Sequence, residues 1–100
     1  MKSRMGALVS TPLGVPWFRA HDYARCREMM DDRDKLPATF AAWEREAQDR
    51  LEGLLDFSCS LEKVEIDPER FAAFCQAQGL RPSAMARNAY AAFVLAQRTF

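Results

Sequence analysis

Hydrophobic residues recur at spacings of three and four over much of this 100-residue chain, a pattern that predicts amphipathic helices. The clearest stripe follows Thr39, whose hydroxyl is suited to cap a helix start; it consists of Phe40, Trp43, Ala47, Leu51, Leu54 and Leu55. Asp67-Pro68-Glu69 predicts another helix start, and Gly79 predicts the end of that helix. The pattern predicts four helices, over about 20–31, 40–55, 68–78 and 82–97.

The segment Leu61–Asp67 alternates in a way that predicts one short strand. Only Val64 and Ile66 form a convincing buried face, which is typical of an edge strand or a two-stranded ribbon. A lone strand leaves backbone groups unpaired, so it needs a partner. The partner is either the N-terminal segment of the same chain, with Ala7–Ser10 as the candidate, or the same strand of a second chain.

We therefore expect a mainly α fold, α+β by strict count, with about four helices and one short strand or two-stranded ribbon. Pro12, Gly14 and Pro16 interrupt the mildly apolar start of the chain. This predicts a flexible leader over residues 1–15 and a single helical domain over residues 16–100. No apolar run approaches the roughly 20 residues that a membrane span needs, and no signal peptide is expected.

The last predicted helix has an apolar face rich in alanine, which would allow another helix to approach closely. This face consists of Met85, Ala89, Ala92, Phe93 and Ala96. The face is one of two candidate surfaces for self-association; the other is the strand Leu61–Asp67.

The formal net charge is +0, so the whole molecule should not attract nucleic acid or an anionic membrane. Charge is nevertheless segregated: residues 1–21 and 70–100 contain only basic side chains among their charged residues, and all 14 acids lie between Asp22 and Glu69. One interpretation is that the basic ends fold against the acidic centre, within one molecule or a dimer. The alternative is that the C-terminal helices present a basic face to a phosphate backbone.

The three cysteines, Cys26, Cys59 and Cys75, are odd in number and widely spaced. This spacing argues against a zinc site and against a disulfide framework. We expect free cysteines that pack as small hydrophobic residues, in a reducing, cytoplasmic setting.

Nothing in the sequence predicts catalysis. The single histidine, His21, would have to serve any Ser–His–Asp or Cys–His arrangement. Asp22 is expected on another face, and Cys26 lies about 140° around a helix from His21, so neither should meet it. Glycines occur singly and form no phosphate-binding loop. We therefore expect no enzyme, and no catalytic, cofactor or metal site.

The segment Leu61–Leu95 resembles a ribbon-helix-helix unit, through its strand, its Asp67-Pro68 helix start and its Gly79-Leu80 turn. The resemblance implies a dimer whose paired strands enter the major groove of DNA. It also implies a phosphate clamp at the start of the last helix. The residues it assigns to DNA are Lys63, Arg81, Ser83 and Arg87.

The chain from Pro16 onwards also resembles a family of small bacterial proteins without a known activity. The shared motifs are Trp17-Phe18, Leu36-Pro37-Ala38-Thr39-Phe40, and Asp67-Pro68 followed by Gly79-Leu80-Arg81-Pro82. This resemblance supports the helix boundaries given above and implies no mechanism.

The sequence thus favours a cytoplasmic, non-catalytic interaction or accessory module that forms a homodimer. The dimer would form through antiparallel strand pairing or through the last helix. A protein partner is also conceivable, and no cofactor is expected. The alternative hypothesis is a dimeric, ribbon-helix-helix-like DNA-binding regulator.

Overall fold

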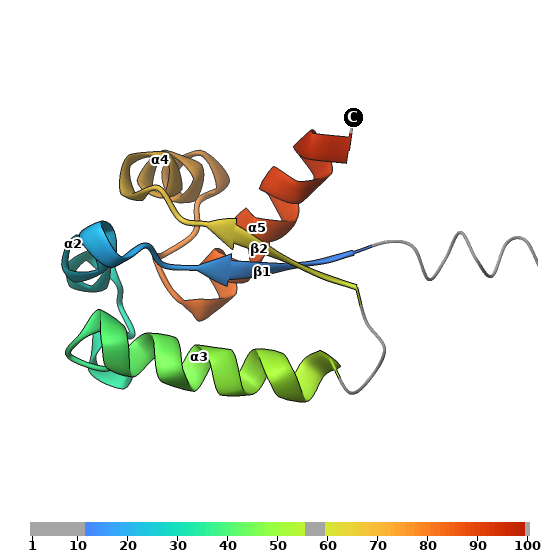
Figure 1. The fold of residues 1–100 in the computed structure, drawn as a ribbon. Helices are drawn as coiled ribbons and strands as arrows, with labels where there is room; N and C mark the ends of the chain where they lie inside the picture. The colour runs from blue at the N-terminus through green and yellow to red at the C-terminus, as the bar shows by residue number, and fades with distance from the viewer. Residues whose placement is uncertain (1–11, 56–59, 100) are drawn as a thin grey trace, which may run out of the picture.

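The computed structural model describes residues 12–55 and 60–99 (Figure 1). Within them, two strands and four α-helices follow one another, which confirms the expected mainly α, α+β fold. The order is β1 (Leu13–Trp17), a 3-10 turn (Ala20–Asp22), α2 (Tyr23–Met29), a 3-10 turn (Arg33–Lys35), α3 (Phe40–Leu55), β2 (Leu61–Glu65), α4 (Pro68–Gln78) and α5 (Ala84–Thr99).

The two strands pair in parallel over their whole length and lie between α3 and α5. Successive side chains of a strand point to opposite faces of the sheet. On one face Trp17 meets α3, with its ring centroid 5.0 Å from that of Trp43. On the other face Gly14 lies against the backbone of Ala91 in α5. Figure 1 accordingly shows α3 below the sheet and α5 behind it.

The sequence analysis missed β1. The partner of β2 is Leu13–Trp17 of the same chain, and not Ala7–Ser10, which lies outside the described residues. Proline usually argues against a strand because it cannot donate to the ladder. In a parallel pair, however, alternate residues face away from the partner, and Pro16 is one of these, so no ladder bond is lost. The expected boundary between leader and domain, at residue 15, therefore falls inside β1.

The local signals for helix ends are confirmed. Thr39 Oγ1 accepts a hydrogen bond from the Ala42 amide at 3.2 Å, and Asp67 Oδ1 accepts one from the Arg70 amide at 3.0 Å. Gly79 follows α4 with φ 67°, a left-handed conformation that glycine adopts without steric cost. The chain therefore sets these helix boundaries through contacts within four residues.

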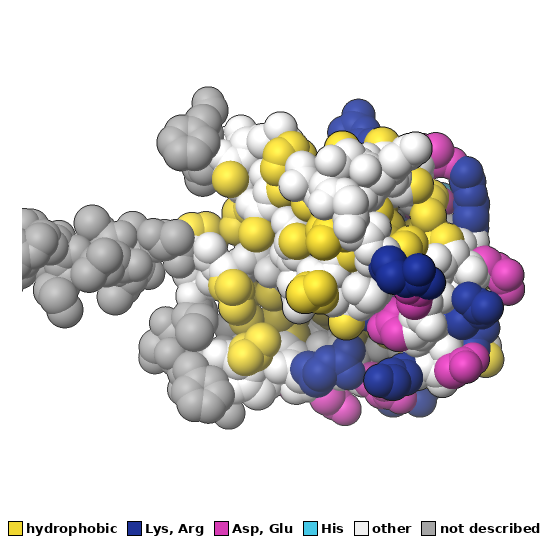
Figure 2. Space-filling model, turned by 180° about the vertical axis from the view of Figure 1, so that it is seen from behind, with side chains coloured by type: hydrophobic (Ala, Val, Ile, Leu, Met, Phe, Trp, Pro, Cys, Tyr) yellow, Lys and Arg dark blue, Asp and Glu magenta, His cyan; other side chains and the backbone are white. Residues whose placement is uncertain are grey.

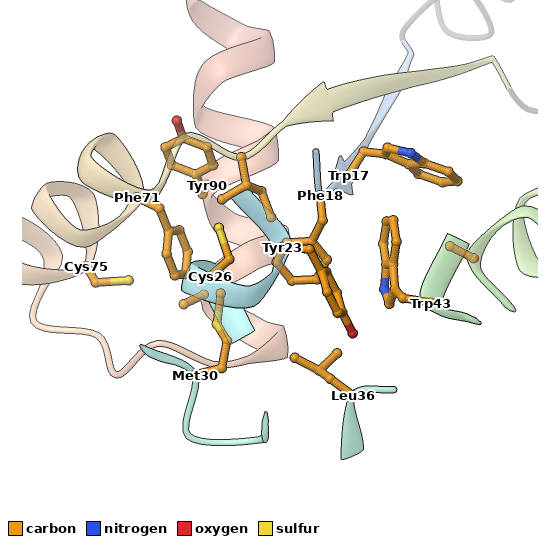
Figure 3. Packing of buried hydrophobic residues seen from close by; sticks show 13 residues of the cluster. Trp17, Phe18, Tyr23, Cys26, Met30, Leu36, Trp43, Phe71, Cys75 and Tyr90 are labelled. Carbon is orange, nitrogen blue, oxygen red and sulfur yellow. The ribbon is translucent and has the colours of Figure 1, made fainter. Parts of the chain in front are cut away.

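Aromatic side chains from β1, α2 and α3 form the main core (Figure 3). The ring centroid of Trp43 lies 5.0 Å from that of Trp17, 4.9 Å from Phe18 and 6.1 Å from Tyr23. All four side chains are buried, as expected for the two tryptophans. The hydroxyl of Tyr23 donates to the Pro37 carbonyl oxygen at 2.5 Å, so the polar end of this ring is satisfied.

The core continues on the other side of the sheet, between β2, α4 and α5. Phe71 is fully buried and packs edge-to-face on Tyr90, with ring centroids 5.6 Å apart. The expected buried face of β2 is confirmed, because Val64 and Ile66 are both 0 % exposed. Val64 packs beside Ala91, where the small side chain lets α5 come close to the strands.

Candidate self-association surface

The outer edge of β2 presents backbone groups with no strand beside them. The Leu13 amide donates to the Ser60 carbonyl at 2.8 Å, and the Ile66 amide donates to the Trp17 carbonyl at 2.9 Å. These two bonds fix which residues of β2 face β1, because the facing residues alternate in a parallel pair. The outward-facing N–H and C=O groups belong to Leu61, Lys63 and Glu65. The sheet formed by the described residues has two strands only, so no strand within residues 12–55 and 60–99 pairs with this edge, which we call the open edge of β2.

The side chains of Lys63 and Glu65 are exposed. The pKa of Arg19 is raised first by its hydrogen bond with Asp22 and additionally by the charge of Glu65, so Glu65 lies within electrostatic reach of a cation. The ammonium of Lys63 instead lies 4.0 Å from the centroid of the Trp17 ring. The neighbouring Glu62 differs, because its carboxylate accepts from the Arg98 guanidinium at 2.8 Å. One cation and one anion, two residues apart on the same face of β2, are therefore outside the salt bridges of the described residues, and Glu65 interacts with the Arg19 guanidinium without a direct contact.

A groove of about 680 Å³ runs between α4 and α5 and reaches β2 at Glu65. Its walls include Phe74 and Phe93, whose ring centroids lie 5.2 Å apart. Phe93 is 44 % exposed, while Tyr90 beneath it is buried. Arg70 lies on the rim. The groove therefore joins an exposed aromatic surface to the open edge of β2.

The outer face of α5 is also apolar, which the sequence analysis had noted for this helix. Met85 is 69 % exposed, and Ala92 and Phe93 are exposed as well. The face that packs on the sheet and on α4 is the other one; it carries Ala86, Tyr90, Ala91 and Leu95. In the view from behind, hydrophobic and uncharged surface extends over much of the molecule, and charged side chains gather at one end (Figure 2).

The sequence analysis did not identify the groove. Phe74, in its wall, is half-buried and also packs against the core. A signal was present, because most exposed positions of α5 over its first three turns are apolar where an exposed helix usually carries charges. These positions are Ala84, Met85, Ala92 and Phe93, with Asn88 as the polar exception. A contiguous exposed apolar surface is typical of a site that a partner covers.

The outer edge of β1 is a weaker candidate for pairing. Pro16 lies on that edge and has no N–H to offer. Beside it lies a hollow of about 310 Å³ between β1, α3 and α5, with Trp43 and Leu51 in its walls and Lys35 and Arg50 at its rim. Figure 2 shows hydrophobic side chains bordering a hollow on this side. Every buried side-chain nitrogen or oxygen of the described residues has a hydrogen-bond partner.

Two of the residues assigned to DNA by the ribbon-helix-helix resemblance are held by carboxylates. The Arg81 Nε donates to Asp31 Oδ2 at 2.5 Å. The Arg87 guanidinium forms two hydrogen bonds of 3.0 Å with Asp32, and its side chain is only 12 % exposed. Arg87 lowers the pKa of Asp32 through this bond. The basic C-terminal part thus folds against the acidic middle of the same chain at these two positions.

The other two DNA candidates lie in different places. Ser83 caps α5, since its Oγ accepts from the Ala86 amide at 3.4 Å. Lys63 shares its face of the sheet with Trp17, whereas α5 packs on the opposite face. The structure therefore brings Arg81, Ser83 and Arg87 together at the start of α5 and places Lys63 apart from them.

The surroundings of His21 correct one expectation. Its Nε2 lies 3.4 Å from Asp22 Oδ2, so the expectation that His21 and Asp22 do not meet is wrong. The histidine side chain is 74 % exposed, and the Asp22 carboxylate also pairs with Arg19. Cys26 is fully buried, and burial raises its pKa to about 11, so its sulfur stays a thiol and not the nucleophilic thiolate.

Cys75 is a buried free thiol like Cys26, as expected; Cys59 lies outside the described residues. Within residues 12–55 and 60–99, no group of three or more His, Cys, Asp or Glu side chains is placed to hold a metal ion. No helix in the same residues has the length and apolar character needed to cross a membrane.

The two family resemblances rest on the amino-acid sequence, whereas the open edge of β2 and the groove beside it are features of the structure. Comparison of the chain with protein-family profiles, with curated proteins and with solved structures finds no match.

Proposed function

We propose that this chain is a non-catalytic interaction module that forms a homodimer in the cytoplasm. The observation that carries the proposal is the open edge of β2, with the aromatic groove between α4 and α5 beside it. The two free thiols, Cys26 and Cys75, fit a reducing compartment.

The physical reason is that an open strand edge is costly to leave as it stands. Proteins usually protect such an edge with proline, bulges, short strands, charged side chains or a covering element. β1 has a proline on its outer edge, whereas β2 carries the charges of Lys63 and Glu65, which disfavour a strand with unmatched charges but can pair with a strand of complementary charge. A partner strand would pair these groups, and it would also cover part of the exposed ring of Phe93.

Absolute mass in solution, measured by light scattering over a dilution series, tests the proposal. We expect twice the 11.4 kDa mass of one chain at high concentration, with dissociation only on strong dilution. A mass of 11.4 kDa at every concentration would reject the homodimer. It would equally reject the ribbon-helix-helix hypothesis, because a ribbon needs two chains.

The DNA-binding alternative remains a prediction without added support. Arg81 and Arg87 are already neutralised by Asp31 and Asp32, which reduces the charge available to a phosphate backbone. Binding that weakens steeply with salt in a duplex titration would favour the alternative over the proposal made here.

A further inference from the structure

We propose that a second copy of this chain pairs antiparallel along the open edge of β2, in the register that sets Lys63 opposite the partner's Glu65. The result is a four-stranded sheet in which the two β2 strands are central. This inference rests on the proposed function, and it adds the direction of the paired strands and their register.

The direction follows from symmetry. A dimer of identical chains normally has a twofold axis, so each subunit contributes the same patch. Two copies of one strand edge related by such an axis run antiparallel. The backbone hydrogen bonds of an antiparallel pair join residues whose N–H and C=O both point outwards. In β2 those residues are Leu61, Lys63 and Glu65, so odd-numbered residues must lie opposite odd-numbered residues.

Three registers satisfy this condition near the middle of β2, and the charges distinguish them. One register sets Lys63 opposite the partner's Lys63. A second sets Glu62 opposite the partner's Glu62. Each of these places like charges directly opposite, which destabilises a strand pair.

The third register sets Lys63 opposite the partner's Glu65 and, by symmetry, Glu65 opposite the partner's Lys63. Val64 then lies on the twofold axis. This register sets opposite charges against each other, and it leaves the Glu62–Arg98 pair intact. The charges of β2 are therefore complementary to those of a second copy of the same strand, and they select this register among the three.

The position of the α4–α5 groove agrees with the same arrangement. The twofold axis would be perpendicular to the plane of the sheet, so the α5 helices of both copies would lie on the same face of the four-stranded sheet. The groove reaches β2 at Glu65, where the partner strand would run. Phe93 and Phe74 would thus border the joined strands, and the exposed area of Phe93 would be reduced on association.

Charge reversal tests the register. The variants are Lys63→Glu, Glu65→Lys and the double exchange, with Glu44→Lys as a control on the exposed side of α3. Dimer dissociation constants come from light scattering or sedimentation, and circular dichroism checks that each variant folds. Both sites are exposed, so folding should persist.

Each single reversal creates two like-charged pairs across the twofold axis, and we expect it to weaken the dimer about tenfold or more. The double exchange restores opposite charges and should return the dissociation constant to within about threefold of the original. Glu44→Lys should leave it unchanged.

Two outcomes overturn the inference while leaving the homodimer in place: single variants that dimerise like the original chain, or a double exchange as weak as the single variants. An original chain that is monomeric at all concentrations would instead overturn the proposed function, and the inference with it. The mass of the original chain, measured first, separates the two failures.

Discussion

Replacing Trp43 with alanine will cost about 3–5 kcal/mol of folding free energy, the usual range for removing a large buried aromatic side chain. Trp43 is 5 % exposed and contacts aromatic rings from β1, from Phe18 just after it, from α2 and from its own helix. Removing it leaves a cavity between Trp17 and Phe18 that neither ring can fill without leaving its own packing. A domain of this size has a free energy of unfolding of about 5–15 kcal/mol, so this one substitution would remove a large fraction of it.

Urea unfolding followed by far-ultraviolet circular dichroism measures this loss. The matched control is Leu54→Ala, a truncation in the same helix at a side chain that is 38 % exposed, which should cost less than about 1 kcal/mol because little area is buried there. Equal unfolding midpoints for the two variants would contradict the central place of Trp43 in the core.

Substitutions at Gly14 and Gly53 will change stability in opposite directions. A methyl group at Gly14 would lie 3.0 Å from the Ala91 carbonyl oxygen and 3.2 Å from its carbonyl carbon. These are backbone atoms of α5, so the helix itself must move away from β1. We expect Gly14→Ala to cost about 1–3 kcal/mol, as overpacking in a close contact does, and a larger side chain to cost more.

Gly53 lies in α3, and a methyl group there would meet nothing within 4 Å. Alanine is the better helix former, so Gly53→Ala should stabilise the chain by about 0.5–1 kcal/mol. The two variants add the same group, and thermal unfolding compares them directly. If Gly14→Ala leaves the melting temperature unchanged or raises it, the close approach of α5 to β1 at Gly14 is wrong.

The helix boundaries were predictable because their causes are local. Thr39, Asp67 and Gly79 act on backbone groups within four residues of themselves, and such contacts are visible in the order of residues. The buried face of β2 was predictable for a similar reason, since Val64 and Ile66 alternate with charged neighbours.

β1 was not predictable in the same way. Its partner lies almost 50 residues further along the chain, and its own sequence, Leu-Gly-Val-Pro-Trp, contains two residues that usually interrupt strands. The strand tolerates both residues at these positions. Gly14 makes room for α5, and Pro16 faces the outer edge of β1, where no hydrogen bond to β2 is needed. These reasons exist only after the strands and α5 have come together.

The candidate surface depends on the same long-range pairing. The sequence predicted that the strand Leu61–Asp67 needs a partner, and it left open whether that partner lies in the same chain or in a second one. The structure supplies an internal partner at one edge and leaves the other edge open. Which residues face that edge follows from the register with β1, so Lys63 and Glu65 could not be singled out as a pair beforehand.

The most direct test of a second copy at this edge is amide hydrogen exchange, read residue by residue by nuclear magnetic resonance at low and high protein concentration. The amides of Glu62, Val64 and Ile66 face β1 and should be protected at both concentrations, which makes them internal controls. The amides of Lys63 and Glu65 face outwards. We predict that they exchange fast in dilute solution and at least about tenfold more slowly in concentrated solution, where the partner strand pairs them. Fast exchange of both amides at every concentration would show that no strand occupies this edge.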